Sequence, residues 1–147
     1  MNLDTKATAP YAIFVLRVTL GVAFLAHGAL LKIGTFGLAG TMGFFGSLGY
    51  PPIFGAIVAL AETAAGIALI GGVWVRTVSL LTLPIMIGAT VQHLPNGWGF
   101  GSPGGGWEFP VMWTVLMVVQ AGLGAGAFAL DPAKLFASKT ETETVTA

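Results

Sequence analysis

Four long apolar runs dominate this sequence and limit what it can fold into. They cover residues 11–31, 53–75, 77–94 and 109–130. A helix needs about 20 predominantly apolar residues to cross the hydrocarbon core of a bilayer, and each run is close to that length. The sequence therefore predicts an all-α integral membrane protein, a four-transmembrane-helix bundle with glycine-rich outer loops.

The composition supports a membrane protein and argues against several other classes. Charged residues make up 8% of the chain and hydrophobic residues 55%, with zero formal net charge, whereas soluble domains carry about 25% charged residues. Nucleic-acid binding is not expected because no basic patch could neutralise phosphates. The chain contains no cysteine, so disulfides, thiolate metal sites and iron–sulfur clusters are excluded. No flavin or nucleotide motif is evident.

The positions of the lysines and arginines predict the orientation. We expect a cytoplasmic N-terminal tail over residues 1–10, a membrane domain over 11–131, and a disordered cytoplasmic tail over 132–147. Four spans place both termini on one side, and the other side carries only Lys32. Cytoplasmic loops are enriched in Lys and Arg, so we expect both termini in the cytoplasm. The basic residues on the side of the termini are Lys6, Arg76, Lys134 and Lys139.

Both outer loops are rich in glycine. Residues 32–52 carry a glycine at every third position from 34 to 49, and residues 95–106 contain several more. Trp98, Phe100 and Trp107 accompany the second loop and suit a membrane interface. Two interpretations remain open: flexible interfacial loops, or a lid over a pocket embedded in the membrane.

Ionisable residues inside the spans are the candidate functional residues, because a charge at the bilayer centre costs about 2.5–3.5 kcal/mol. Arg17 lies in the first run and Glu62 in the second. Counting the helical rise from the ends of the runs separates them by only about 6–7 Å in depth. We therefore expect an Arg17–Glu62 ion pair.

A second polar group is expected near the outer face. His27 and His93 fall at similar depths, and Glu108 and Lys32 lie close to that level. Histidine gains or loses a proton near neutral pH, which suits a proton-handling site. The alternative is structural, with the histidines bonded to loop carbonyls and the buried ion pair fixing helix register. Small residues lie on the same helix faces as these polar ones and predict close helix packing; they are Gly21, Gly28, Gly55, Ala59, Gly66, and a Gly122–Gly126 pair on the fourth helix.

These residues together resemble the DoxX family of small four-span bacterial membrane proteins. The resemblance covers about residues 11–131, and its motifs are short but occur in a specific order. They are Arg17, His27-Gly28, Lys32, a Gly-Tyr-Pro before the second span, Glu62 with Gly66, Gly71-Gly72, Arg76 and His93. The resemblance implies quinone-linked redox chemistry, as in the related DoxD subunits of thiosulfate:quinone oxidoreductases, or a scaffold role in membrane complexes that counter oxidative stress.

Two functions follow as hypotheses. In the first, the chain is a subunit of a quinone-linked redox complex, with a proton relay of Glu62, His93 and His27. A partner enzyme supplies the electrons, and the bundle can also self-associate. In the second, the chain is a non-catalytic anchor or assembly subunit. The candidate quinone or ligand pocket of the first hypothesis consists of Arg17, Lys32, His27, His93 and Glu108.

Two further classes have less support from the sequence. A small proton-coupled transporter of the four-span exporter type carries its membrane glutamate in the first span, where this chain has Arg17. A haem or metal site would need clustered ligands, and the sequence contains no HxxxH or ExxH pair. We therefore expect no metal.

Overall fold

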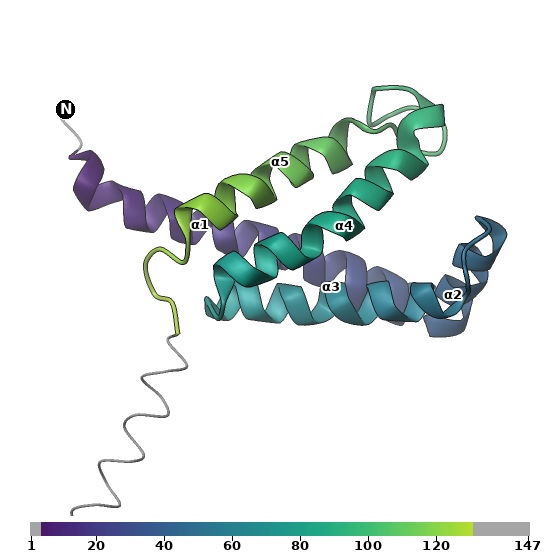
Figure 1. Ribbon diagram of the computed structural model, residues 1–147, viewed down its shortest axis with the longest axis horizontal. Coiled ribbons are helices and arrows are strands. Elements are labelled where there is room, and N and C mark those ends of the chain that lie inside the picture. Colours follow the sequence, from purple (N-terminus) through teal and green to yellow (C-terminus); the bar gives the residue numbers. More distant parts are fainter. Residues whose placement is uncertain (1–3, 131–147) are drawn as a thin grey trace, which may run out of the picture.

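The computed structural model describes residues 4–130, and all regular structure within them is helical. The expected tail over residues 132–147, with Lys134 and Lys139, lies outside the described residues. Figure 1 shows the arrangement of the helices. The elements are α1 (Thr5–Leu25), the π-helical segment η1 (Ala26–Thr35), α2 (Leu38–Ser47), α3 (Ile53–Gly71), α4 (Val75–His93), the 3₁₀ turn η2 (Leu94–Asn96) and α5 (Glu108–Leu123).

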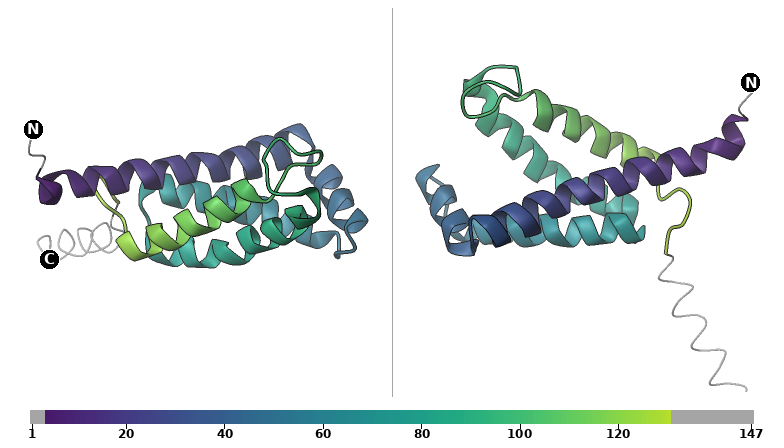
Figure 2. Two further views of the ribbon diagram at one scale, coloured as in Figure 1. Left: turned by 90° about the horizontal axis from the view of Figure 1, so that it is seen from above. Right: turned by 180° about the vertical axis from the view of Figure 1, so that it is seen from behind.

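The helices form two antiparallel pairs. The first pair is α1 with α3, and the second is α4 with α5. The pairs lie close together near the α3–α4 turn and diverge toward the loop between α4 and α5, as Figures 1 and 2 show. Where they meet, a common core of large apolar side chains holds them together. Its fully buried members include Phe24, Leu69 and Met117.

Three helical stretches are long and apolar enough to cross a membrane. They are Thr5–Thr35, Ile53–Gly71 and Val75–Asn96. The first includes both α1 and η1, so it extends beyond both ends of the predicted run 11–31. The α5 helix is also apolar but has only 16 residues.

The fourth predicted run does not remain helical to residue 130. Its helix ends at Leu123, where Gly124 takes a φ of 85°, and Gly126 has a φ of 67°. Backbone with positive φ cannot continue a right-handed helix. The predicted Gly122–Gly126 pair on one helix face is therefore wrong, because Gly126 lies beyond the helix.

Prolines lie at helix starts, and glycines lie where two helices approach closely. Pro52 immediately precedes α3, and Pro110 lies in the first turn of α5, where a missing N–H leaves no helical bond unmade. A Cβ on Gly21 would lie 3.0 Å from the Gly66 carbonyl oxygen, and one on Gly66 would lie 2.8 Å from that of Gly21. The predicted close packing of small residues between the first two spans is confirmed.

Both outer loops are folded back on the helices. In the first, Thr41 of α2 donates its hydroxyl to the Lys32 carbonyl, and Gly55 of α3 packs against the backbone of Thr41. In the second, the amides of Trp107 and Glu108 donate to the carbonyls of Gly97 and Trp98. These contacts give each loop a defined path over the end of the bundle where the helix pairs diverge.

Candidate functional site

Glu62 pairs with Lys32, not with Arg17. The Lys32 ammonium lies 2.9 Å and 2.7 Å from the two Glu62 carboxylate oxygens, and the exposed fractions of the two side chains are 21% and 7%. The predicted Arg17–Glu62 pair is wrong because Arg17 lies level with Leu69 and Ile70 at the end of α3, not with Glu62. The first helical stretch, Thr5–Thr35, is much longer than α3, so matching the ends of the two apolar runs misplaced the first span relative to the second.

Arg17 instead contacts the other end of α3. Its fully buried guanidinium donates to the carbonyls of Leu69 at 2.7 Å and Ile70 at 2.9 Å, and to that of Ala127 at 3.0 Å. The last carbonyls of a helix lack intrahelical partners and favour a cation. Arg17 therefore caps α3 and joins it to the segment that follows α5.

This contact explains the Gly71-Gly72 pair. Gly72 has a φ of 77°, and a Cβ there would contact both the Arg17 guanidinium and the backbone of Ala129. The Leu130 amide donates to the Gly71 carbonyl at 2.9 Å. Only glycine allows the guanidinium to approach so closely, so Gly72 belongs to the same structural unit as Arg17.

His27 lies where the first helix crosses α5. Its Nδ1 is 3.0 Å from the Ala23 carbonyl oxygen. Because a carbonyl oxygen can only accept, Nδ1 carries a proton, and Nε2 is free to bond to another group. The ring stacks on Phe109 at 6.5 Å and contacts Trp113 edge to face at 5.1 Å. His27 also lies within electrostatic range of the Glu62 carboxylate.

His93 and Glu108 hold the second outer loop. His93 Nδ1 is 2.9 Å from the Gly105 carbonyl oxygen, and a Glu108 carboxylate oxygen accepts from the Phe100 amide at 3.2 Å. Asn96 adds two bonds from its side-chain amide to the carbonyls of the same loop. The bonding of a histidine to a loop carbonyl thus occurs at His93, whereas the partner of His27 belongs to its own helix.

The candidate residues therefore form three groups within the described part of the chain. Arg17 lies at the α3–α4 turn, and His93 and Glu108 bond to the second outer loop. Lys32 and Glu62 are in direct contact inside the bundle, and His27 lies within electrostatic range of Glu62. Between residues 4 and 130, no three His, Cys, Asp or Glu side chains gather as metal ligands would.

The aromatic side chains around His27 were not identified from the sequence. The Phe24 and Trp113 rings are 4.7 Å apart, and those of Phe109 and Trp113 are 5.6 Å apart. The spacing of Phe109 and Trp113 by four residues places both on one face of α5. That spacing is the signal that could have pointed to this cluster.

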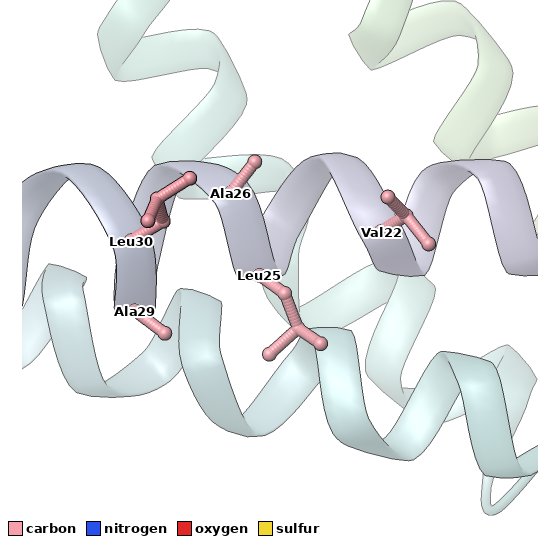
Figure 3. A pocket seen from close by; sticks show the side chains of 5 residues that line it. All are labelled: Val22, Leu25, Ala26, Ala29 and Leu30. Atoms are coloured by element: carbon pink, nitrogen blue, oxygen red, sulfur yellow. The ribbon is translucent and has the colours of Figure 1, made fainter.

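A shallow apolar groove lies elsewhere, along the first helix. Its volume is about 510 Å³, and its lining side chains are labelled in Figure 3. They are Val22, Leu25, Ala26, Ala29 and Leu30. The groove offers only hydrocarbon, which suits lipid chains, and none of the candidate polar residues lines it.

Comparison with known proteins identifies the family of this chain. The family model DoxX matches residues 12–94. A Bacillus subtilis (strain 168) protein named "Putative oxidoreductase CatD" is 31% identical over 118 residues, which cover 80% of this chain and 83% of that protein. No solved structure matches the chain. With its long apolar helices, the chain is a membrane protein, and it belongs to the DoxX family.

Proposed function

We propose that this chain is a membrane subunit of a quinone-linked redox complex and that a quinone headgroup, or a similar small planar ligand, binds beside His27. The observation that carries the proposal is the position of His27. Its ring is half-buried against Phe109 and Trp113 and lies within electrostatic range of Glu62, which pairs with Lys32. Aromatic walls with a few placed polar groups are typical of small-molecule sites.

The chemistry of these groups suits quinone reduction and its reverse. Reducing a quinone to a hydroquinone takes two electrons and two protons. In its imidazolium form, His27 donates from Nε2 to a carbonyl oxygen of the quinone and passes that proton to the oxygen as the ring is reduced; in its neutral form, Nε2 accepts the proton back from the hydroquinone. Glu62 can exchange a proton with His27 while Lys32 balances its charge. The electrons come from a partner redox enzyme, a class consistent with the printed name of the Bacillus relative.

The remaining candidate residues have supporting roles in this proposal. Arg17 holds the helix pairs together through backbone carbonyls and does not contact the ligand. His93 and Glu108 fix the second outer loop at the end where the helix pairs diverge. A loop held in this way would limit access of water to a ligand near His27.

We also propose that the chain crosses a bacterial inner membrane four times, with both termini in the cytoplasm. A 16-residue helix is about 24 Å long, shorter than the roughly 30 Å hydrocarbon core, so residues 124–130 must complete the fourth crossing. Non-helical backbone is tolerated there when protein groups satisfy it. The carbonyls of Gly124 and Ala127 accept from Gln120 and Arg17, and the Ala127 amide donates to the Pro10 carbonyl.

A matched pair of histidine variants tests the ligand site. Binding of decylubiquinone and menadione to the protein in lipid nanodiscs is followed by quenching of tryptophan fluorescence. His27→Phe keeps the ring packing but removes the nitrogens, and we expect at least about tenfold weaker binding, equivalent to about 1.4 kcal/mol. His93→Gln keeps a donor for the Gly105 carbonyl and should bind like the unmodified protein. Equal binding by His27→Phe, or none by the unmodified protein, contradicts the proposal.

The second candidate function is a non-catalytic anchor or assembly subunit. It is favoured by the bonds that His93 and Glu108 make to their own loop, because such bonds give both residues a structural role. Purification from native membranes in mild detergent, with mass spectrometry of proteins and lipids, separates the two functions. A redox enzyme with bound quinone supports the first, and a partner without quinone supports the second. Finding neither a partner nor a quinone contradicts both.

A further inference from the structure

Four buried polar side chains among residues 4–130 have one atom without a hydrogen-bond partner. One of these atoms is Arg17 Nε, whose guanidinium already donates three other bonds. The other three are the Ser79 hydroxyl, the Gln120 carbonyl oxygen and the Trp113 indole nitrogen, in residues that are 0%, 0% and 4% exposed. Such groups are costly in an apolar interior unless something satisfies them.

Ser79 differs from the threonines of the same helices. Thr63, Thr82, Thr90 and Thr114 each donate their hydroxyl to the carbonyl four residues earlier. This local bond is the usual way to satisfy a helical hydroxyl in an apolar environment. Ser79 makes no such bond, so its hydroxyl is available to a group outside its own helix.

The three atoms follow one interface. Arg76 of α4 donates to the Ala121 carbonyl of α5 at 3.0 Å, and in this antiparallel pairing Ser79 lies within about one helical turn of Gln120. Trp113 lies seven residues from Gln120, or about 10 Å along α5, and its ring contacts His27. The polar atoms therefore run from the Arg17 end of the bundle toward His27.

Water is the small molecule whose bonding suits all three positions. The Gln120 oxygen only accepts, the Trp113 indole only donates, and the Ser79 hydroxyl does both. Internal water molecules make two to four hydrogen bonds to buried polar groups that have no other partner. An anion or a cation would satisfy only the donors or only the acceptors.

We infer that Ser79, Gln120 and Trp113 hold a file of internal water molecules between α4, α5 and the first helix, directed toward His27. The file would connect the α3–α4 turn end of the bundle with the interior. Its use as the proton supply of His27 rests on the proposed function, whereas its existence does not.

Radiolytic labelling with short X-ray pulses in ¹⁸O water tests the file directly, because hydroxyl radicals formed from bound water modify side chains next to it. Met117 is the reporter, since it is 0% exposed and lies about level with Ser79 on the facing helix. We expect Met117 in nanodiscs without quinone to be labelled well above the background of a fully buried residue. The double variant Ser79→Ala with Gln120→Leu should reduce this labelling several-fold.

Thr114→Val is the matched control, because its hydroxyl is already bonded to the Pro110 carbonyl, and it should leave Met117 labelling unchanged. Ser79→Ala alone provides a milder variant, since Gln120 also bonds Gly124. The inference is overturned if Met117 in the unmodified protein is labelled no more than a fully buried residue. It is also overturned if neither variant reduces the labelling of Met117. Failure here leaves quinone binding beside His27 untouched, because that binding is measured separately.

Discussion

Glu62 and Arg17 are both buried in apolar helices, and the cost of burying each charge is offset in a different way. Glu62 has a cationic partner, Lys32, which contacts both carboxylate oxygens. Arg17 has three backbone carbonyls from two separate segments. The two residues are therefore energetically independent, although the sequence suggested that they form a pair.

A double-mutant cycle in detergent should show this independence. Lys32→Met leaves the Glu62 carboxylate buried without a partner, and we expect it to lower the unfolding free energy by about 3–5 kcal/mol. Glu62→Gln should lower it too, but the two changes together should cost much less than their sum. The measurement is thermal or denaturant unfolding of the single and double variants.

Arg17→Met serves as the comparison in that cycle. Combined with Glu62→Gln, it should give additive losses, because residues that share no partner show little coupling. Coupling of Glu62 to Arg17 as strong as its coupling to Lys32 would contradict the observed pairing.

The buried polar residues could be identified from the sequence, but their partners could not. An ionisable side chain inside an apolar run is visible by inspection, which is why Arg17, His27, Glu62 and His93 were identified. Pairing them requires the relative height of the helices, and hydropathy did not show that Arg17 lies level with the end of α3. Ser79 and Gln120 could not be recognised as unpartnered, because the burial and bonding of uncharged polar residues are not visible in the sequence.

At the scale of a single element, the π-helical segment η1 sets the position of Lys32. Its bonds reach back five residues, as in the Phe36 amide donating to the Leu31 carbonyl at 2.8 Å. A π segment has more residues per turn than an α-helix, so it rotates Lys32 relative to His27. No residue type marks a π segment, so this change in register could not be predicted.

Gly28 lets this segment approach α3, and replacing it should separate the two. A Cβ on Gly28 would lie 2.7 Å from the Thr63 nitrogen and 2.8 Å from the Ala59 carbonyl oxygen. We expect Gly28→Ala to lower the unfolding free energy by about 1–3 kcal/mol, the typical cost of overpacking. Unfolding in detergent measures the loss.

Gly88→Ala is the matched control on α4, because a Cβ there meets nothing within 4 Å. Alanine favours a helix over glycine by up to about 1 kcal/mol, so this variant should be neutral or slightly more stable. Equal unfolding free energies for the two glycine variants would show that close contact between η1 and α3 does not exclude a side chain at position 28.

At the scale of the whole molecule, exposed aromatic side chains lie at both ends of the bundle. Trp74 and Phe128 are 71% exposed near the α3–α4 turn, and Trp98 and Phe100 are 54% and 69% exposed in the second outer loop. Exposed aromatic residues of this kind are enriched at the two interfaces of a membrane. The distribution agrees with a bundle whose long axis crosses the bilayer, as the apolar runs predicted.

Labelling of single cysteines should establish the topology, since the native chain has none to interfere. In intact cells, Gly101→Cys in the second outer loop should react with a membrane-impermeant maleimide. Ala7→Cys near the N-terminus should react only after the cells are permeabilised. Both positions are exposed, and a Cβ on Gly101 meets nothing within 4 Å. The opposite pattern would reverse the proposed orientation.

The contact between Arg17 and Ala127 has a consequence for biosynthesis. The two residues are 110 positions apart in the chain, and ribosomes add about 5–20 residues per second. Synthesis of the Ala127 acceptor therefore follows that of Arg17 by roughly 5–20 s. During that interval the first helix carries a charged group whose hydrogen bonding is incomplete. Insertion of the first helix is therefore finished only after Ala127 has been made, and nascent chains that stop before Ala127 leave the Arg17 guanidinium without one of its three acceptors.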